Sequence, residues 1–311
     1  MKLAMLFTGQ GSQFAGMGRF LAENFTIARE TFEQADEVLG EELSRLCWEG
    51  PEDRLALTEN TQPATLVVSI AAYRVLDITP TLAAGHSLGE YSALTAAGAL
   101  SFEDAVRLVR ERGRRMQQAV PEGVGGMVVL RKLTKQEAVD LVDQVTAGVC
   151  EIANFNAPGQ YVLSGEKAAL DQVVDMVGPR RALELPVSVP FHCSLLQSAA
   201  TEFAELLDQV EMRDPAYPIY CNVDAKPVTT AAAARDALKR QFAGSVLWES
   251  SAKRMLQDEG VRQFVECGPK PVLIRLVTQV ARAVGIEDIE TSSASSLEEV
   301  AQLKRGEPLA T

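Results

Sequence analysis

The chain has few histidines and few cysteines, and both scarcities narrow what it can do. Only two histidines and five cysteines occur among 311 residues. The cysteines are an odd number, widely scattered and without a C-x-x-C pair, so we expect free thiols in a reducing compartment and no metal site. No apolar run approaches the roughly 20 residues that span a bilayer, and the N-terminus lacks a cleavage-like site. The sequence therefore predicts a cytoplasmic protein with no membrane association.

Basic residues are also fewer than acidic residues. The sequence has 30 Lys and Arg against 42 Asp and Glu, a formal net charge of −12. Nucleic acid is disfavoured as a partner, because neutralising its phosphates requires a basic surface. One short stretch departs from this trend and contains five arginines, Arg107, Arg110, Arg112, Arg114 and Arg115. They form either a local patch for the phosphates of a cofactor or an acidic protein, or a solvated helix face.

Strands and helices alternate along most of the chain. An apolar strand at residues 3–7 leads through a glycine turn into helical periodicity over residues 20–32. A second short strand at 81–84 leads through another glycine turn into a helix at 88–97. Such alternation is typical of a mainly parallel sheet that is covered by helices.

The pattern changes between residues 122 and 190. Strand, helix, two strands, helix and strand follow one another there, which is the βαββαβ order of the ferredoxin-like arrangement. After Pro190 the earlier alternation resumes. The sequence therefore predicts a large α/β domain from residues 1–121 and 191–311, with an inserted ferredoxin-like subdomain at 122–190.

The second glycine turn, Gly85-His86-Ser87-Leu88-Gly89, has the form G-x-S-x-G. Between a strand and a helix, such a sharp turn holds a serine hydroxyl exposed, and glycines permit the close backbone approach. The turn also aims the first helical amides at one point, so the N–H of Leu88 is a candidate oxyanion donor. We therefore predict that Ser87 is a nucleophile.

A nucleophilic serine needs a base. Histidine suits that role near neutral pH, because its unperturbed pKa is about 6.5. His86 adjoins Ser87, and consecutive side chains leaving a tight turn point apart, so His86 is better suited to bracing the turn. Elimination leaves His192 as the predicted base, with a hydrogen-bonded core histidine as the alternative.

An arginine lies on the apolar side of a predicted helix at residues 101–120, which has Ser101 as its N-cap. Phe102, Val109 and other apolar residues form one stripe, and Arg112 lies in the middle of it. Burying an unpaired guanidinium is costly, so Arg112 should have an anionic partner. An internal carboxylate and a ligand carboxylate, bound bidentately, are equally compatible with this pattern.

Together these motifs resemble the malonyl-CoA:acyl carrier protein transacylases, including the discrete acyltransferases that serve polyketide synthases. The similarity covers essentially the whole chain, and its landmarks appear in family order. They are Gly9-Gln10-Gly11-Ser12-Gln13, the ten residues from Gly85 to Leu94, Arg112-Gly113, Asn154 to Gln160, Pro190-Phe191-His192-Cys193 and Glu266-Cys267-Gly268-Pro269. The resemblance implies transfer of a malonyl group from malonyl-CoA to the phosphopantetheine thiol of an acyl carrier protein, with ping-pong kinetics and no bound cofactor.

The resemblance also implies individual catalytic roles. Ser87 would be the nucleophile that carries the acyl group, His192 the general base and acid, and Arg112 the clamp on the malonyl carboxylate. The backbone N–H groups of Gln10 and Leu88 would form the oxyanion hole.

Further roles implied by the resemblance concern the substrate and the histidine. Met116, Asn156 and Phe191 would contact the substrate. A main-chain carbonyl would orient His192, and the matching position is Leu247, where the family often has glutamine. The implied fold is a hydrolase-like large domain with the ferredoxin-like insert.

Three other functions are compatible with parts of the pattern. An acyltransferase for another acyl group, such as methylmalonyl, would use the same residues. A proofreading acyl-carrier-protein hydrolase would use Ser87 and His192 but has no need of a carboxylate clamp. A noncatalytic scaffold that docks carrier proteins is disfavoured, because Ser87, His192 and Arg112 are all present.

Overall fold

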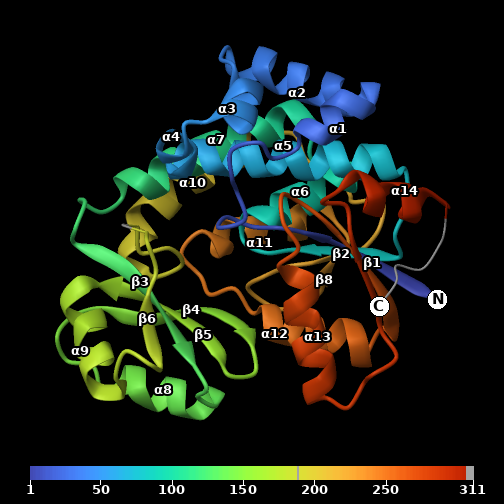
Figure 1. The fold of residues 1–311 in the computed structure, drawn as a ribbon. Helices are drawn as coiled ribbons and strands as arrows, with labels where there is room; N and C mark the ends of the chain where they lie inside the picture. Colours follow the sequence, from blue (N-terminus) through green and yellow to red (C-terminus); the bar gives the residue numbers. More distant parts are fainter. Residues whose placement is uncertain (188, 306–311) are drawn as a thin grey trace.

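The computed structural model describes residues 1–187 and 189–305. These residues form a larger and a smaller body, each built on its own sheet (Figure 1). The larger sheet has the strand order β10-β9-β1-β2-β7-β8, and the smaller has the order β4-β5-β3-β6. The predicted combination of a mainly parallel sheet with a separate small-domain sheet is confirmed.

The larger sheet is parallel except at one edge, where β8 pairs antiparallel with β7. Its strands are β1 (Lys2–Phe7), β2 (Leu82–Gly85), β7 (Ile219–Tyr220), β8 (Pro227–Val228), β9 (Val261–Cys267) and β10 (Glu290–Ser293). Phe7 pairs with Gly85 on one side and with Cys267 on the other. The carboxyl ends of three central strands therefore meet at one edge, the place where open α/β sheets position functional loops.

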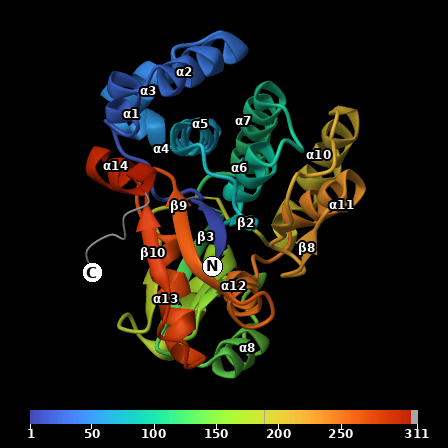
Figure 2. The same ribbon diagram turned by 90° about the vertical axis from the view of Figure 1, so that its right-hand side faces the viewer.

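Helices cover both faces of this sheet, and Figure 2 shows the two layers. One layer contains α1 (Arg19–Asn24), α2 (Thr26–Leu39), α3 (Leu43–Glu49), α4 (Glu52–Ala56), α5 (Thr58–Leu76), α6 (Leu88–Ala96), α7 (Phe102–Gln118) and α14 (Leu297–Arg305). The other contains α12 (Trp248–Gln257) and α13 (Leu273–Ala283). Alternate residues of β1 enter different cores, Met5 one and Leu6 the other, because neighbouring side chains of a strand point to opposite faces. No helix within residues 1–187 and 189–305 combines the length and apolarity needed to cross a membrane.

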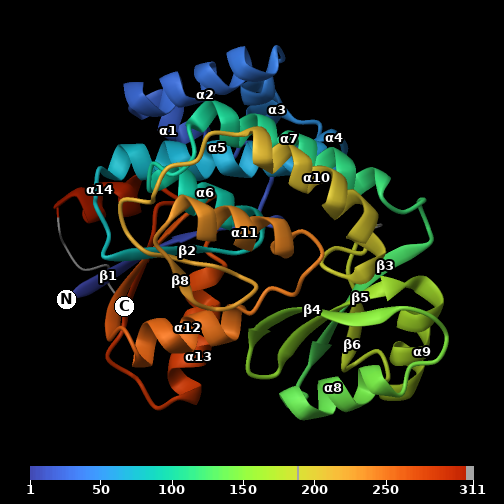
Figure 3. The same ribbon diagram turned by 180° about the vertical axis from the view of Figure 1, so that it is seen from behind.

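A further group of helices lies at the β2 side of the sheet, which Figure 3 shows from behind. It comprises the short 3₁₀ helix η1 (Ser194–Leu196), α10 (Gln197–Gln209) and α11 (Ala231–Gln241). The buried residues of α11 are Ala234, Ala237, Leu238 and Gln241, at the spacing of one helix face. Gln241 is thus a polar residue at the end of an otherwise apolar stripe.

The smaller body has an antiparallel sheet with two helices. It consists of β3 (Gly125–Arg131), α8 (Lys135–Asp143), β4 (Cys150–Ala157), β5 (Gln160–Glu166), α9 (Lys167–Val177) and β6 (Ala182–Glu184). This is the βαββαβ order that the sequence predicts, and it lies within the predicted insert, whose exact limits at 122 and 190 stay a prediction.

The two bodies are joined by backbone hydrogen bonds along β4. Val246 of the larger body donates to the carbonyl of Ala153 at 2.8 Å, and its carbonyl accepts from the N–H of Phe155 at 2.9 Å. The Ser245 hydroxyl donates to the carbonyl of Ile152 at 2.7 Å. The segment around Val246 therefore extends the edge of the small sheet and fixes the smaller body against the larger one.

Candidate active site

Ser87 lies in a strained turn between β2 and α6. It is the N-cap residue of α6, with φ 51° and ψ −105°, a conformation that non-glycine residues rarely adopt. A Cβ on Gly85 would lie 1.9 Å from the backbone of Gly89, and one on Gly89 would lie 2.0 Å from the carbonyl oxygen of Phe7. Only glycine fits at both places, so the predicted strand–turn–helix context of Ser87 is present.

The hydroxyl of Ser87 lies 2.7 Å from Nε2 of His192. On the other side of the ring, Nδ1 lies 3.0 Å from the carbonyl oxygens of both Gln241 and Gly244. Carbonyls only accept, so Nδ1 carries the proton and Nε2 is free to accept one from the serine. The structure therefore brings the two predicted residues together in the geometry of a serine and its base.

The carbonyl that orients His192 was assigned to the wrong residue. The carbonyl of Leu247 accepts instead from the N–H of Ser251 at 3.0 Å, because Leu247 is the N-cap of α12 and its carbonyl belongs to the first helical turn. The acceptors are Gln241 and Gly244, which end α11 and begin the segment that pairs with β4.

The imidazole of His192 is neutral at physiological pH. Its side chain is only 4% exposed. Burial, the nearby Arg112 guanidinium and His86 together lower the pKa of His192 to about 3, although the two carbonyl hydrogen bonds act in the opposite direction. A base must be deprotonated to work, and this environment keeps it so.

Arg112 is buried beside the same serine oxygen. Its Nη2 donates to Ser87 Oγ and to Gln241 Oε1, both at 3.0 Å, and its Nη1 donates to Gln62 Oε1 at 2.9 Å. The guanidinium carbon also lies 5.3 Å from the ring centroid of Tyr91. Among the described residues no carboxylate lies within ion-pair distance of Arg112, so its partners in this structure are neutral acceptors, and pairing with a ligand carboxylate stays a prediction.

The other arginines of the crowded stretch are paired with the chain's own carboxylates. The pairs are Arg107–Asp104, Arg110–Glu41, Arg114–Glu59 and Arg115–Glu202. These four side chains therefore do not form a free basic patch for phosphates, and Arg112 stands apart from them.

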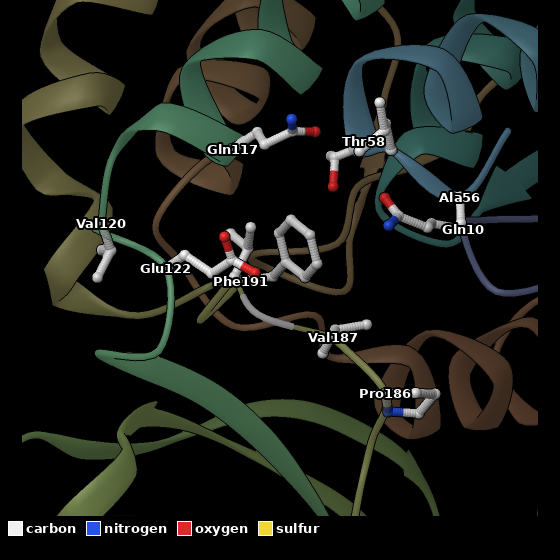
Figure 4. A pocket seen from close by; sticks show the side chains of 11 residues that line it. Gln10, Ala56, Thr58, Gln117, Val120, Glu122, Pro186, Val187 and Phe191 are labelled. Carbon is white, nitrogen blue, oxygen red and sulfur yellow. The ribbon is translucent and has the colours of Figure 1, made fainter. Parts of the chain in front are cut away.

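A cavity of about 300 Å³ lies beside Gln10 and Phe191 (Figure 4). It is lined by Gln10 from the loop after β1, by the start of α5 at Thr58, by the end of α7 and by Phe191, which directly precedes His192. Within the described residues, neither the backbone N–H of Gln10 nor that of Leu88 donates a hydrogen bond. Both N–H groups are therefore without a protein acceptor in the described part of the chain, and their role as an oxyanion hole stays a prediction.

Two predicted substrate contacts have protein partners in this structure. The sulfur of Met116 accepts from Nε2 of Gln62 at 3.5 Å, so Met116 supports a residue that holds Arg112. Oδ1 of Asn156 lies 2.9 Å from Nε2 of His86. His86 therefore faces away from Ser87 and braces the turn against the smaller body, and substrate contact by Met116 or Asn156 stays a prediction.

Several residues of the site were missed in the sequence. Besides Gln62 they are Glu90, Asn222 and Gln241, all buried. Asn222 Oδ1 accepts from the N–H of Ser87 at 2.6 Å, and Gln241 Nε2 donates to the carbonyl of Ser87 at 2.8 Å. Gln62, Glu90 and Gln241 lie among apolar residues of helices, which is the kind of signal that identifies Arg112, whereas Asn222 lies in a turn after β7 and has no such signal.

Comparisons with known proteins agree with this geometry. The acyl transferase domain family matches residues 4–309. The malonyl CoA-acyl carrier protein transacylase of Haemophilus influenzae is 42% identical over 305 residues, which cover 94% of this chain and 97% of that protein. The transacylase of the same name from Bacillus subtilis strain 168 is 42% identical over 301 residues, covering 93% and 95%.

Solved structures have the same fold over the whole chain. A malonyl-transacylase in complex with its type II polyketide synthase acyl-carrier protein superimposes with a TM-score of 0.93 at 39% identity, covering 98% of this chain and 100% of that one. The malonyl CoA-acyl carrier protein transacylase of Coxiella burnetii gives a TM-score of 0.93 at 36% identity, covering 98% and 97%.

Proposed function

This chain belongs to the acyl transferase family, among the malonyl CoA-acyl carrier protein transacylases, and on that premise we propose that Ser87, His192 and Arg112 carry out its reaction. The chain is an acyltransferase that moves a malonyl group from malonyl-CoA to the phosphopantetheine thiol of an acyl carrier protein. The proposal depends chiefly on one observation: Ser87 Oγ lies 2.7 Å from Nε2 of His192 and 3.0 Å from Nη2 of Arg112.

In the first half-reaction Ser87 becomes acylated. Nε2 of His192 takes the hydroxyl proton as Oγ attacks the thioester carbonyl, and the tetrahedral oxyanion accepts from the N–H groups of Gln10 and Leu88. When the carbon–sulfur bond breaks, coenzyme A leaves as a thiol with the proton from His192. The malonyl group is then an ester on Ser87.

Arg112 suits a donor that carries a carboxylate close to the reacting carbonyl. In a malonyl group one carbon separates the thioester carbonyl from the carboxylate, so a recognising cation must lie beside the nucleophile. Arg112 meets that requirement, and its planar guanidinium can hold a carboxylate through two parallel hydrogen bonds. An uncharged acyl group would leave this buried cation without an anion.

In the second half-reaction the carrier protein collects the acyl group. Its phosphopantetheine thiol would enter through the cavity beside Gln10 and Phe191 and give its proton to His192 as the sulfur attacks the ester carbonyl. The bond between the carbonyl carbon and Ser87 Oγ would then break, and Oγ would take the proton back from His192. Departure of one product before the second substrate binds is ping-pong kinetics. Coenzyme A thioester and phosphopantetheine are therefore substrates in this proposal, and neither is a resident cofactor.

We also propose the cytoplasm as the location of this chain. All five cysteines are buried free thiols, which supports a reducing compartment.

Intact-protein mass spectrometry after brief incubation with malonyl-CoA tests the proposal, with acetyl-CoA and methylmalonyl-CoA in parallel. A malonyl-sized adduct should form on the wild type and on the control Ser92→Ala, which removes another buried hydroxyl of α6. It should be absent from Ser87→Ala and should move to added phosphopantetheinylated carrier protein. An adduct that persists in Ser87→Ala, or that decays to free malonate without transfer, would refute the assignment.

The clamp has a test of its own. Arg112→Ala should slow malonyl adduct formation by about 10- to 150-fold, the range for losing a hydrogen bond to a charged group, and should weaken the preference over acetyl-CoA. An unchanged preference would show that Arg112 does not select the donor.

A further inference from the structure

Gln241 lies between two buried ionisable groups, Arg112 and Glu90. Its side chain, fully buried at the end of α11, accepts from Arg112 Nη2 through Oε1 at 3.0 Å and donates to Glu90 Oε2 through Nε2 at 2.9 Å. Glu90 is 1% exposed and also accepts from the N–H of Asn222 at 2.9 Å. One amide thus stands between a guanidinium and a carboxylate that both lack an ion-pair partner among residues 1–187 and 189–305.

The same residue contacts the nucleophile turn and the base. Its Nε2 donates to the carbonyl of Ser87 at 2.8 Å, and its own backbone carbonyl lies 3.0 Å from Nδ1 of His192. Gln241 therefore contacts Ser87, His192 and Arg112. An apolar side chain could fill this part of the core without burying polar atoms that need partners. The hydrogen bonds of Gln241 therefore indicate a role beyond core packing.

Each end of the Gln241 amide faces groups of the opposite polarity. The oxygen faces the cation Arg112. The nitrogen faces acceptors only: Glu90 Oε2 and the carbonyl of Ser87, with Asn222 Oδ1 more distant at 3.4 Å. A carboxylate in place of the amide would satisfy Arg112 but would face Glu90 as a like charge. Burial raises the pKa of Glu90 to about 7, although the hydrogen bonds from Asn222 and Gln241 and the charge of Arg112 oppose the rise.

Arg112 is held entirely by neutral groups. Gln62, Gln241 and the hydroxyl of Ser87 all accept from it, and none of them carries a charge. Two buried opposite charges attract strongly when they meet directly, and a protein carboxylate on Arg112 would compete with any ligand carboxylate. Because the amide of Gln241 lies between Glu90 and Arg112, the guanidinium is held in place but is not neutralised by a protein carboxylate.

We infer that Gln241 is a positioning residue for donor selection: it holds Arg112 in place and keeps Glu90 from pairing with it, so that the charge of Arg112 is left for the carboxylate of the donor. This inference rests on the proposed function, because it names the residue that prepares the clamp for a malonyl group.

The test is Gln241→Glu, which places a carboxylate against Arg112 without changing the size of the side chain. kcat/KM for malonyl-CoA should fall at least about tenfold relative to kcat/KM for acetyl-CoA, the loss expected when a hydrogen bond to a buried charge is withdrawn from the substrate. A merely structural role of Gln241 would lower both values by the same factor. An unchanged ratio of the two values would overturn the inference.

A charge swap provides a second variant that keeps the pair hydrogen-bonded. Gln241→Glu combined with Glu90→Gln moves the carboxylate from one side of the amide to the other, so it tests the inference even if the single variant does not fold. The swap should lose malonyl preference as Gln241→Glu does, whereas Glu90→Gln alone should keep the wild-type ratio within about twofold, because Arg112 gains no carboxylate. Retained preference in the swap would overturn the inference alone, whereas a wild type that takes no malonyl group would overturn the proposed function itself.

Discussion

The base of this enzyme should work at an unusually low pH. Burial, Arg112 and His86 lower the pKa of His192 to about 3, so the imidazole stays unprotonated where ordinary histidines are charged. We expect the rate of Ser87 acylation to be flat from about pH 8 down to about pH 5, because a base is active only in its neutral form. An ordinary histidine, with a pKa of about 6.5, would retain only about 3% of its neutral form at pH 5.

The share of Arg112 in this shift can be estimated from the structure. Arg112 Nη2 and His192 Nε2 both bond to Ser87 Oγ, at 3.0 and 2.7 Å, so their charges are close neighbours. At a separation of about 5 Å and an effective dielectric constant of about 20, two unit charges repel by about 3 kcal/mol, or about two pKa units. Arg112→Ala should therefore raise the pKa of His192 and move the acid limb of the profile upward by one to about two units.

Single-turnover acylation by acetyl-CoA is the suitable assay, because the acetyl group has no carboxylate to titrate or to bind Arg112. Adduct formation would be followed by quenched-flow mass spectrometry in buffers of constant ionic strength. Near-ultraviolet circular dichroism at each pH would show that the fold is retained. A wild-type midpoint near the ordinary histidine pKa, or a profile that does not move in Arg112→Ala, would refute the reasoning.

Three further predictions concern the turn, the two bodies and the thiols. Gly85→Ala should abolish the malonyl adduct and lower the melting temperature, because its Cβ would lie 1.9 Å from the backbone of Gly89, whereas Gly126→Ala, whose nearest contact is 3.6 Å, should leave both nearly unchanged; equal effects would contradict this. Asn156→Ala should cost about 1–2 kcal/mol in urea unfolding, because Nε2 of His86 loses its partner, and an unaltered midpoint would count against the bracing role. All five cysteines are buried, and burial raises the pKa of every one of them, so iodoacetamide should label them slowly until the protein is unfolded; fast labelling of the native protein would contradict that burial.

The sequence predicted β1, β2 and the element order of the insert, because these strands are mostly apolar and glycine marks several of their turns. It did not predict β10, whose residues Glu-Thr-Ser-Ser are polar. The start of the central helix α5 has no such signal in the sequence. The apolar run begins at Ala64, yet α5 begins at Thr58 and its first turns are buried and polar. Thr61 donates to the carbonyl of Leu55 at 2.5 Å, and Asn60 donates to the carbonyl of Arg54 at 2.8 Å. Hydropathy cannot reveal that these polar side chains are buried, because the carbonyls that bond them belong to the preceding helix α4.

Individual side chains were predictable at the site, whereas backbone groups were not. Ser87, His192 and Arg112 each have a chemical signal in the sequence, namely a glycine-flanked turn, the scarcity of histidine and a cation on an apolar stripe. A carbonyl has no such signal, because every residue has one and its direction depends on where a helix begins. The helix that starts after Leu247 takes up that residue's carbonyl, which is why the prediction failed there.

Arg112 and Gln241 show what a polar residue on an apolar helix face can and cannot indicate. Both lie at such positions, and in both cases the pattern alone allows a satisfied core residue. A functional polar residue differs from a satisfied core residue in that its hydrogen-bond partners lie at one reactive group. Arg112 and His192 meet on a single atom, Ser87 Oγ, while Gln241 contacts both and separates the cation from Glu90. A core residue needs only enough hydrogen bonds, whereas Arg112 is held by neutral acceptors and Gln241 lies between it and Glu90, the arrangement from which we infer that the charge of Arg112 serves a ligand.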